Sequence, residues 1–392
     1  MSISISPSFI HYLFSVAGVA ALVSLLARYL SQSRPHKDPV PAFLKDTAST
    51  ARALPASWYR SPGVYELERR AIFAKIWILT SHKLGFTEPG SPQAFPIMTE
   101  DKGKSSILSC KYQSWSYGLN GELAKAPGYD DMKGFDKTKN GLLPIHVHVD
   151  AKGFIWVNLD SSTTTTPEDF STEFRNIDQM ARHKGFNFEN YHFDHTWGMS
   201  GDYNWKTLAD NYNECYHCKT THPDAADVAD LSAYRVVTKG GNIEHFANTK
   251  PDMEVEGKGL KIVSNYYFPN FCMAVSPNFF YIMRCVPTSP GHCSMEYEVY
   301  RYKNATDEGF QTIDAMFKRV LGEDKWLRNN AQRNLNAGVF VNVEMHPKME
   351  QGPLYFQHRV RGLLNGHYRL EKAAGKDINA AQHVQSDASR GT

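Results

Sequence analysis

The chain has 392 residues, of which 42% are hydrophobic, 12% aromatic and 21% charged, so it can bury the cores of two or three domains. This composition excludes collagen-like, disordered and disulfide-scaffold proteins, and a net charge of +2 provides no electrostatic attraction for a nucleic-acid partner. Six cysteines are too few for a secreted disulfide framework and indicate a reducing compartment; none of them precedes Cys110.

An uncharged apolar run, FIHYLFSVAGVAALVSLL, occupies residues 9–26 and is followed by Arg28, Arg34 and Lys37. Because a helix of about 20 residues spans a bilayer core, residues 1–30 are predicted to be a single-pass membrane anchor. A secretory signal peptide would carry basic residues before the apolar run, and MSISISPS has none. The basic residues after the run predict a cytosolic location for the remainder of the chain.

Residues 31–60 are rich in Pro, Ser and Ala and are predicted to form a linker. Apolar residues at helical spacing then predict an amphipathic helix over residues 64–77. From residue 95 to residue 159, short alternating runs separated by Gly and Asn-Gly turns predict a small antiparallel β unit. Residues 61–163 are therefore predicted to be a small β domain.

The second half of the chain mixes longer helices and strands. Helices are predicted over residues 167–183, 205–217 and 312–335, and strands over residues 265–286 and 294–302. Because helices and strands are segregated along the chain, the predicted fold class is α+β with an antiparallel sheet rather than a Rossmann fold. The polar residues 373–392 are predicted to be a disordered tail.

The densest group of chemically reactive residues is NWKTLADNYNECYHCKTTHP, residues 204–223. On a continuous helix, Asp210, Glu214 and His217 would share one face, and His222 follows just before a proline. Two imidazoles with nearby carboxylates are the ligands used by divalent iron or zinc. The same residues are also compatible with an ordinary polar helix, so this pattern alone leaves both interpretations open.

The same segment contains a C-x-x-C pair, Cys215 and Cys218, for which two other interpretations exist. A thioredoxin-like pair needs its first cysteine at a helix N-terminus, where the dipole lowers the thiol pKa. A structural zinc site needs a second ligand pair at suitable spacing, which the three later cysteines do not supply. Both interpretations are weaker than the iron or zinc site built on the histidines.

The pattern NWKxxxDNYxECYHCxxxHP resembles the catalytic segment of Rieske-type non-haem iron ring-hydroxylating oxygenases, in the choline and carnitine monooxygenase-like branch. Three further stretches resemble the same branch. They are LERRAIFAKIW (residues 67–77), CKYQSWSYGLNGELAKAP (residues 110–127) and residues 323–357, which begin with EDKWLRNNAQRNL. Together they cover most of residues 65–365. The resemblance implies a helix-grip catalytic domain over residues 164–372, preceded by a Rieske-like domain over residues 61–163.

Carried onto this sequence, the resemblance makes His217 and His222 two ligands of a mononuclear Fe(II), with Asp324 as the third ligand. Glu214 would take the acidic position that links the iron site to the electron-donating cluster of a neighbouring subunit. The resemblance also implies a small-molecule substrate, an external reductase and a homo-oligomer, by analogy a trimer.

The sequence departs from the family where a Rieske [2Fe–2S] cluster would be held by two Cys and two His, as CxH and CxxH. Cys110 is in place, but Gln113 occupies the position of the second-motif histidine, and the first motif is missing between FTEPG and AFPI. His146 and His148 alternate on a predicted strand, yet with Cys110 they still leave the site one ligand short. The Rieske-like domain is therefore predicted to be truncated, with Cys110 as a remnant.

Two functions follow from these features. The first is an O2-dependent monooxygenase that uses a foreign electron source to hydroxylate a quaternary ammonium compound or a hydrophobic metabolite. The second is a catalytically impaired homologue that acts as a binding or partner subunit, or a mis-spliced gene model that lacks an exon. Aromatic residues in the predicted sheet could hold an ammonium group, but such residues more often form the core.

Overall fold

The computed structural model describes residues 52–86, 107–129, 131–161, 170–224, 229–249 and 262–380. The predicted membrane anchor at residues 1–30 lies outside these ranges. Within them, no helix has both the length and the apolar character that crossing a bilayer requires.

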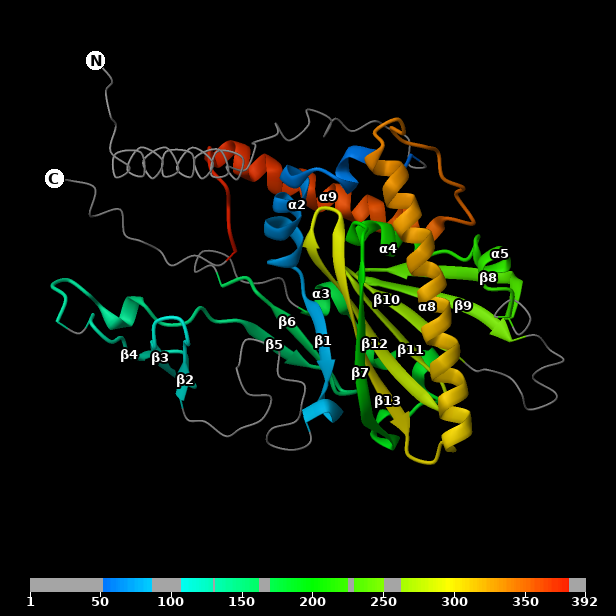
Figure 1. Cartoon of the computed structure of the whole chain (residues 1–392), viewed down its shortest axis with the longest axis horizontal. Coiled ribbons are helices and arrows are strands. Elements are labelled where there is room, and N and C mark those ends of the chain that lie inside the picture. Colours follow the sequence, from blue (N-terminus) through cyan, green and yellow to red (C-terminus); the bar gives the residue numbers. More distant parts are fainter. Residues whose placement is uncertain are drawn as a thin grey trace, which may run out of the picture.

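A seven-stranded antiparallel sheet forms the centre of the fold (Figure 1). Its strand order is β7-β13-β12-β11-β10-β9-β8. The strands are β7 (Tyr191–Gly201), β8 (Ala229–Lys239), β9 (Asn242–Thr249), β10 (Val263–Tyr267), β11 (Phe271–Val275), β12 (Phe279–Ser289) and β13 (His292–Tyr302). The expected strands over 265–286 and 294–302 are thus present, and the antiparallel sheet of the predicted α+β class is confirmed.

Both faces of this sheet are buried, as β12 illustrates. Phe279, Tyr281 and Met283 belong to a core shared with the helices, whereas Phe280 and Ile282 belong to a second core on the opposite face. Successive side chains of a strand point to opposite faces, so a strand buried on both sides needs a continuous apolar run. This explains the near absence of polar residues from 271 to 283.

Helices cover one face of the sheet. The longest, α8 (Asp307–Asn336), begins at Thr306, whose hydroxyl accepts a hydrogen bond from the backbone N–H of Gly309. It runs along the strands, while α9 (Gln351–Ala374), α2 (Pro62–Glu68) and α4 (Trp205–Tyr212) gather at one end of the sheet (Figure 1). A π-helical turn over Arg69–Phe73 extends α2, so the helix expected over residues 64–77 is present in most of its length.

The predicted small β domain is split between two sheets. Strands β1 (Ile78–His82), β6 (Phe154–Asn158) and β5 (His146–Val149) form one sheet, which packs on the main sheet through the second core. Strands β2 (Ile107–Ser109), β3 (Ser116–Gly118) and β4 (Leu123–Lys125) form a separate and largely exposed sheet. Within residues 61–163, α2 instead buries its apolar face against the helices of the catalytic part.

The prediction of a linker over residues 31–60 is wrong for its described part. Leu54, Trp58 and Tyr59 are buried in the core that contains α4 and α9. The Tyr59 hydroxyl donates to Asp210 (2.6 Å), and the Gln357 amide donates to the other oxygen of the same carboxylate (2.8 Å). The prediction rested on the proline content of the segment. The aromatic side chains of Trp58 and Tyr59, which anchor the segment in the core, were not considered.

Three other boundaries differ from the prediction. The helix expected over 205–217 ends at Tyr212. In the described part of the helix expected over 167–183, from residue 170 onward, α3 (Phe170–Phe174) is followed by 3-10 turns. Asn176 has a left-handed backbone conformation, which no α-helix can contain. Residues 373–380 of the predicted disordered tail are part of the fold, where the backbone N–H of Ser161 donates to the carbonyl of Ala380; the rest of that tail lies outside the described residues.

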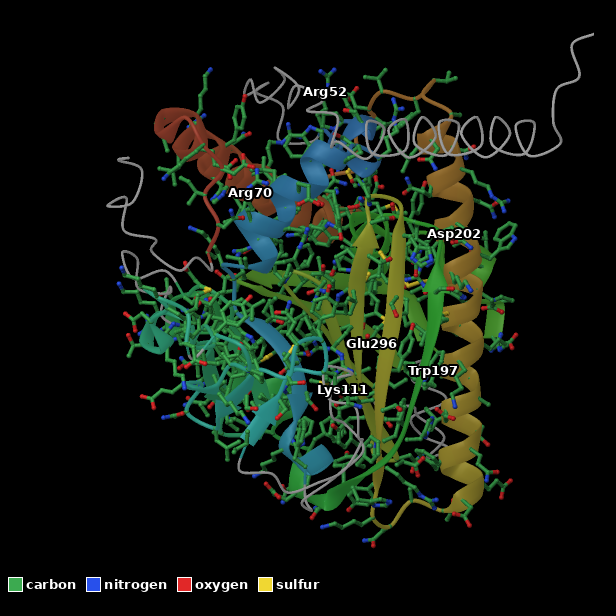
Figure 2. The ribbon with its side chains drawn as sticks, turned by 60° about the vertical axis from the view of Figure 1, so that its left-hand side comes forward. Arg52, Arg70, Lys111, Trp197, Asp202 and Glu296 are labelled. Atoms are coloured by element: carbon green, nitrogen blue, oxygen red, sulfur yellow. A yellow bond between two sulfur atoms is a disulfide. The ribbon has the colours of Figure 1, made fainter. Side chains whose placement is uncertain are left out.

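A fully buried ion pair joins α2 to α4. Glu68 and Lys206 are both 0% exposed, with Lys206 Nζ 2.5 Å from Glu68 Oε1, and the Trp205 indole donates to the other carboxylate oxygen at 2.8 Å. Asn204 caps α4 by accepting a hydrogen bond from the backbone N–H of Lys206 (2.9 Å). A second ion pair, Arg70 with Glu371 at 2.6 Å, joins the same N-terminal segment to α9 (Figure 2 labels Arg70).

Removing one member of the buried pair leaves the other charge buried and unpaired. We therefore expect Lys206→Met to lower the free energy of unfolding by about 3–5 kcal/mol, and Glu68→Leu combined with Lys206→Met to cost less than the sum of the single changes. Urea unfolding of the four proteins measures this coupling. The control is Glu66→Gln in the exposed Glu66–Arg69 pair, whose side chains are 47% and 59% exposed and whose loss should cost less than about 1 kcal/mol. A Lys206→Met variant as stable as this control would contradict the prediction.

Stability should also depend on the protonation of Asp210. Burial raises the pKa of this carboxyl from 3.8 to about 7, although the hydrogen bonds from Tyr59 and Gln357 oppose the rise. Between about pH 4 and pH 7 the folded state then binds more protons than the unfolded state. The free energy of unfolding should fall as pH rises through this window, by at most about 1.4 kcal/mol per pH unit. Asp210→Asn should flatten the profile in urea unfolding between pH 5 and pH 8, and an unchanged slope would refute the assignment to Asp210.

Candidate metal centre

The two histidines of the motif flank a single helical turn. Helix α5 (Cys218–Thr221) lies between His217 and His222, and backbone N–H groups of Thr221 and His222 donate to the carbonyls of His217 (3.0 Å) and Cys218 (2.9 Å). The H-x4-H spacing therefore brings the two imidazole rings together, with centroids 5.4 Å apart.

Helix α8 supplies the third side chain. Asp324 Oδ1 lies 3.0 Å from His222 Nε2 and 3.3 Å from His217 Nε2. The three candidate ligand atoms all lie within 4.8 Å of one another. The structure thus brings together the three residues that the family resemblance selected, although Asp324 is more than 100 positions from the histidines.

A second layer of carboxylates holds the outer nitrogens of both rings. His217 Nδ1 lies 2.5 Å from Glu214 Oε1, and His222 Nδ1 lies 2.7 Å from Glu323 Oε2. A carboxylate at Nδ1 favours the tautomer that carries its proton there, which leaves Nε2 with a free lone pair. The Nε2 atoms of both rings face Asp324.

These contacts also set the charge of the metal-free centre. Burial would lower the pKa of His217, but hydrogen bonds with Asp324 and Glu214 raise it to about 9. The pKa of His222 is likewise raised by Asp324 and Glu323 against the effect of burial. Burial would raise the pKa of Asp324, but hydrogen bonds with the two histidines bring it well below its usual range. A metal ion bound between these residues must therefore compete with the protons that the carboxylates stabilise on the imidazoles.

The donor set fits a mononuclear ferrous ion. Two imidazoles and one carboxylate form the two-His, one-carboxylate triad that leaves positions open on iron. Asp324 Oδ1 is 3.0 and 3.3 Å from the Nε2 atoms of His222 and His217. These separations are close to those between neighbouring ligand atoms that each lie about 2.1 Å from one metal ion. Outer carboxylates that fix the ring orientation are the usual companions of metal-bound histidines.

Glu214 reaches His217 by a different route from the one predicted. Helix α4 ends at Tyr212, so Asp210, Glu214 and His217 do not share a helical face. Instead Glu214 lies in a turn, where its second oxygen accepts a hydrogen bond from the backbone N–H of Tyr216. Cys215 and Cys218 form a disulfide that flanks His217, so their thiols are not available as zinc ligands, and Cys218 is the first residue of the short helix α5.

Cys110, the predicted cluster remnant, lies in an exposed turn after β2, beside Lys111 (Figure 2). The CxxH motif would place a histidine three residues after Cys110. Gln113 occupies that position, in the same exposed turn. His146 and His148 belong to β5 in a different sheet, where His148 stacks on Phe170. Within the described ranges, Cys110 joins no group of three potential metal ligands, so these residues do not fit a Rieske cluster.

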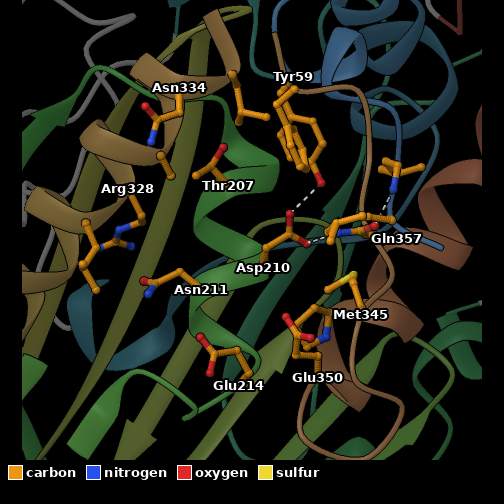
Figure 3. Close-up of a pocket in the computed structure, with 18 residues that line it drawn as sticks. Tyr59, Thr207, Asp210, Asn211, Glu214, Arg328, Asn334, Met345, Glu350 and Gln357 are labelled. Carbon is orange, nitrogen blue, oxygen red and sulfur yellow. Dashed lines mark hydrogen bonds between the residues drawn. The ribbon is translucent and has the colours of Figure 1, made fainter. Parts of the chain in front are cut away.

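A pocket of about 480 Å³ opens beside the metal centre (Figure 3). It lies between α4, α8, α9 and the N-terminal segment, and Asp210, Asn211 and Glu214 line the α4 side. Arg328 of α8 also lines this pocket. The same Glu214 that holds His217 therefore also faces this pocket.

Two residues around the centre, Glu323 and Arg328, are not distinguished by the sequence pattern. Both lie within the stretch EDKWLRNNAQRNL. The Asn211 amide lies 3.4 Å from His217 Nε2. Glu323 directly precedes the candidate ligand Asp324 in the sequence. This position could have indicated its role, because a metal-bound histidine usually donates its second ring N–H to a carboxylate. A basic residue one turn beyond Asp324 could have indicated Arg328.

Comparison with known proteins agrees with this geometry. Residues 188–366 match the model of the ring hydroxylating alpha subunit, catalytic domain. The chain is 24% identical to the carnitine monooxygenase oxygenase subunit of Acinetobacter baumannii, over 79% of this chain and 94% of that protein. It is 26% identical to the chloroplastic choline monooxygenase of Beta vulgaris, over 77% and 75% of the two chains.

Solved structures share the fold. A quaternary ammonium Rieske monooxygenase linked to carnitine oxidation by gut microbiota superposes with a TM-score of 0.67 at 21% identity, covering 81% of this chain and 97% of that one. Naphthalene 1,2-dioxygenase from a Rhodococcus species superposes with a TM-score of 0.59 at 16% identity, covering 82% and 96%. Residues 188–366 are thus similar to the catalytic domain of ring hydroxylating alpha subunits, and most of the chain is similar to carnitine and choline monooxygenases.

Proposed function

We propose that this chain is the oxygenase component of an O2-dependent monooxygenase that hydroxylates a small quaternary ammonium compound. The observation that carries the proposal is the convergence of His217, His222 and Asp324, with both imidazoles fixed from behind by Glu214 and Glu323. The names of the relatives, carnitine and choline monooxygenases, support the substrate class.

Ferrous iron bound by the triad would supply the activation of dioxygen for hydroxylation. The chain's own residues prepare that site. Glu214 and Glu323 keep the Nδ1 protons of the histidines, so that each Nε2 is available as a ligand. Asp324 contributes the negative charge that partly neutralises a divalent ion.

Electron supply is the second part of the proposal. Hydroxylation at a mononuclear iron requires electrons, and the remaining motif residues Cys110 and Gln113 cannot hold the family's [2Fe–2S] relay. We therefore assign electron delivery to an external reductase that acts directly on this chain, and we expect the chain itself to assemble as a homotrimer.

Iron content tests the centre. After anaerobic Fe(II) loading and desalting, we expect close to one iron per chain, and we expect His217→Ala, His222→Ala and Asp324→Ala to retain almost none. Glu323→Gln should bind iron about 10- to 100-fold more weakly than the wild type, because its amide orients His222 less strongly. Metal analysis and anaerobic titration provide the measurements.

The matched control for these variants is Glu308→Gln, an exposed change near the start of the same helix α8. It should leave iron content unchanged. Absence of iron from the wild type, or equal iron in the triad variants and the control, would contradict the proposed centre and favour a non-catalytic partner subunit.

Loss of the cluster makes a separate spectroscopic prediction. The dithionite-reduced protein should give no Rieske-type EPR signal, and iron should not exceed about one equivalent, because only one of the four cluster ligands is present. A Rieske signal that disappears in Cys110→Ser would show that a cluster assembles through that residue, and the external-reductase proposal would fail.

A further inference from the structure

The chain contains a disulfide where its cysteine content predicts none. Cys215 and Cys218 are bonded to each other, whereas the other four cysteines are free thiols. Two of these, Cys285 and Cys293, are buried in contact with each other and still remain thiols. In the reducing compartment that the cysteine content indicates, a disulfide is usually a transient redox device rather than a structural bridge. The Cys215–Cys218 pair is therefore a candidate for redox chemistry.

A structural role explains little of this bridge. A disulfide stabilises mainly by restricting the unfolded chain, and the effect is smallest for short loops, such as this one with a sequence separation of 3. The backbone already holds the two cysteines together, because the N–H of Cys218 donates to the carbonyl of Cys215 (3.3 Å). Their Cα atoms are 5.0 Å apart, within the ordinary range for a disulfide, so the bridge can form and break with little backbone movement.

The bridge encloses a candidate iron ligand. His217 lies between the two cysteines in the chain, and its Nε2 atom is 3.3 Å from Asp324 Oδ1. Cys218 follows His217 directly, so one peptide unit joins a redox-active sulfur residue to an imidazole of the metal centre. Electrons released by the sulfurs therefore have a short covalent route to the site where dioxygen would react.

Two separate cavities adjoin the turn that carries these residues. Glu214 lines the pocket of about 480 Å³ beside the metal centre (Figure 3). Cys215 lines another cavity, of about 180 Å³, together with Tyr234 and two exposed cations, Arg235 and Lys348. The two cavities share no lining residue. An external thiol can thus approach Cys215 from its own side, where the positive charges favour its thiolate form.

We propose that Cys215 and Cys218 form the electron store of this chain and replace the missing cluster. In the dithiol form they supply the two electrons that one monooxygenation consumes, and they end as the disulfide present in the structure. This inference rests on the proposed function and names its electron source. The external reductase then acts on the disulfide rather than on an iron–sulfur cluster.

The reaction balances with one O2, one substrate C–H group and one dithiol. One oxygen atom enters the new C–OH group, and the other leaves as water together with the two thiol hydrogens. Dioxygen gains four electrons, of which two come from the C–H bond and two from the sulfurs as the S–S bond forms. Ferrous iron at the triad would supply the activation of dioxygen.

An external dithiol restores the pair by thiol–disulfide exchange. Its thiolate attacks the sulfur of Cys215, the S–S bond breaks, and Cys218 takes up a proton and becomes a thiol. The second thiol of the donor then attacks the mixed disulfide, which releases Cys215 as a thiol and the donor as a disulfide. The partner is therefore a dithiol reductant.

A single turnover without external reductant tests the inference. The full chain is reduced with a phosphine, desalted, loaded anaerobically with Fe(II) and mixed with O2 and either L-carnitine or choline. We expect about one oxidised product per chain and the loss of two thiols, because one dithiol carries two electrons. Alkylation in denaturant followed by peptide mass spectrometry should show all 6 cysteines free before the reaction, and Cys215 joined to Cys218 after it.

Variants link the thiol loss to the metal centre. Cys215→Ser combined with Cys218→Ser should form no product from O2 in this assay, whereas the matched control Cys110→Ser, which removes an exposed cysteine, should keep both the product and the thiol loss. Without substrate, O2 should still oxidise the pair to the disulfide, with H2O2 as the other product. Asp324→Ala should slow this oxidation because it removes the iron, and equal rates in this variant and the wild type would overturn the inference.

Hydrogen peroxide separates this inference from the proposed function, because it carries both the oxygen atom and the electrons. The double serine variant should hydroxylate with H2O2 as well as the wild type does, which also shows that the variant is folded. Hydroxylation with O2 alone by that variant, or turnover of a wild type that keeps all its thiols, would overturn the role of the pair and leave the proposed function in place. Iron-dependent oxidation of the pair without hydroxylation by any route would support the redox role and refute the proposed function.

Discussion

The buried ion pair between Glu68 and Lys206 is the constraint on which the metal centre depends. It fixes the start of α4 against α2, and α4 lies between the sheet and the other helices. His217 follows only five residues after α4 ends, so its position is determined largely by the placement of that helix. Two formal charges held without water tolerate little displacement, because separating them in the interior costs far more than separating them at the surface.

The same region sets the register between α4 and α8. Gln332 accepts a hydrogen bond from the backbone N–H of Asn204 (3.0 Å) and another from the Thr207 hydroxyl (3.3 Å), and its amide donates to the carbonyl of Tyr59 (3.0 Å). Gln332 lies eight residues, about two helical turns, beyond Asp324. One side chain thereby ties α8 to the helix that leads to the histidines, which explains how ligands more than 100 residues apart meet within about 3 Å.

The parts of this arrangement that follow from local chemistry could be predicted from the sequence. Alternation and long apolar runs indicated the antiparallel sheet, and helical periodicity indicated α8. The two histidines with nearby carboxylates made a metal site one of two open interpretations, and the structure places one turn of helix between His217 and His222. The end of α4 at Tyr212 could not be predicted, because the following residues have ordinary helical propensity and the turn is fixed by the contact of Glu214 with His217.

Long-range features needed either the family resemblance or the structure. No local pattern distinguishes Asp324 from a solvated acid on a helix, and none shows that Glu323 contacts His222. The segment at residues 52–60 was misread for a similar reason: Tyr59 is anchored by Asp210, 151 positions away. In each case the deciding interaction joins residues that are distant in sequence, so composition and periodicity carry no signal of it.

The structural support of the metal centre explains how it can persist without the cluster. The elements that position the triad are α2, α4, α8 and α9, held by Glu68–Lys206, Arg70–Glu371 and the contacts of Gln332. None of these contacts involves β2, β3 or β4, the strands nearest to the altered cluster motif, and Cys110 lies in an exposed turn there. Loss of the cluster ligands therefore removes an electron relay while leaving the interactions that hold the iron ligands intact. The positions of His217, His222 and Asp324 therefore do not depend on the strands around Cys110.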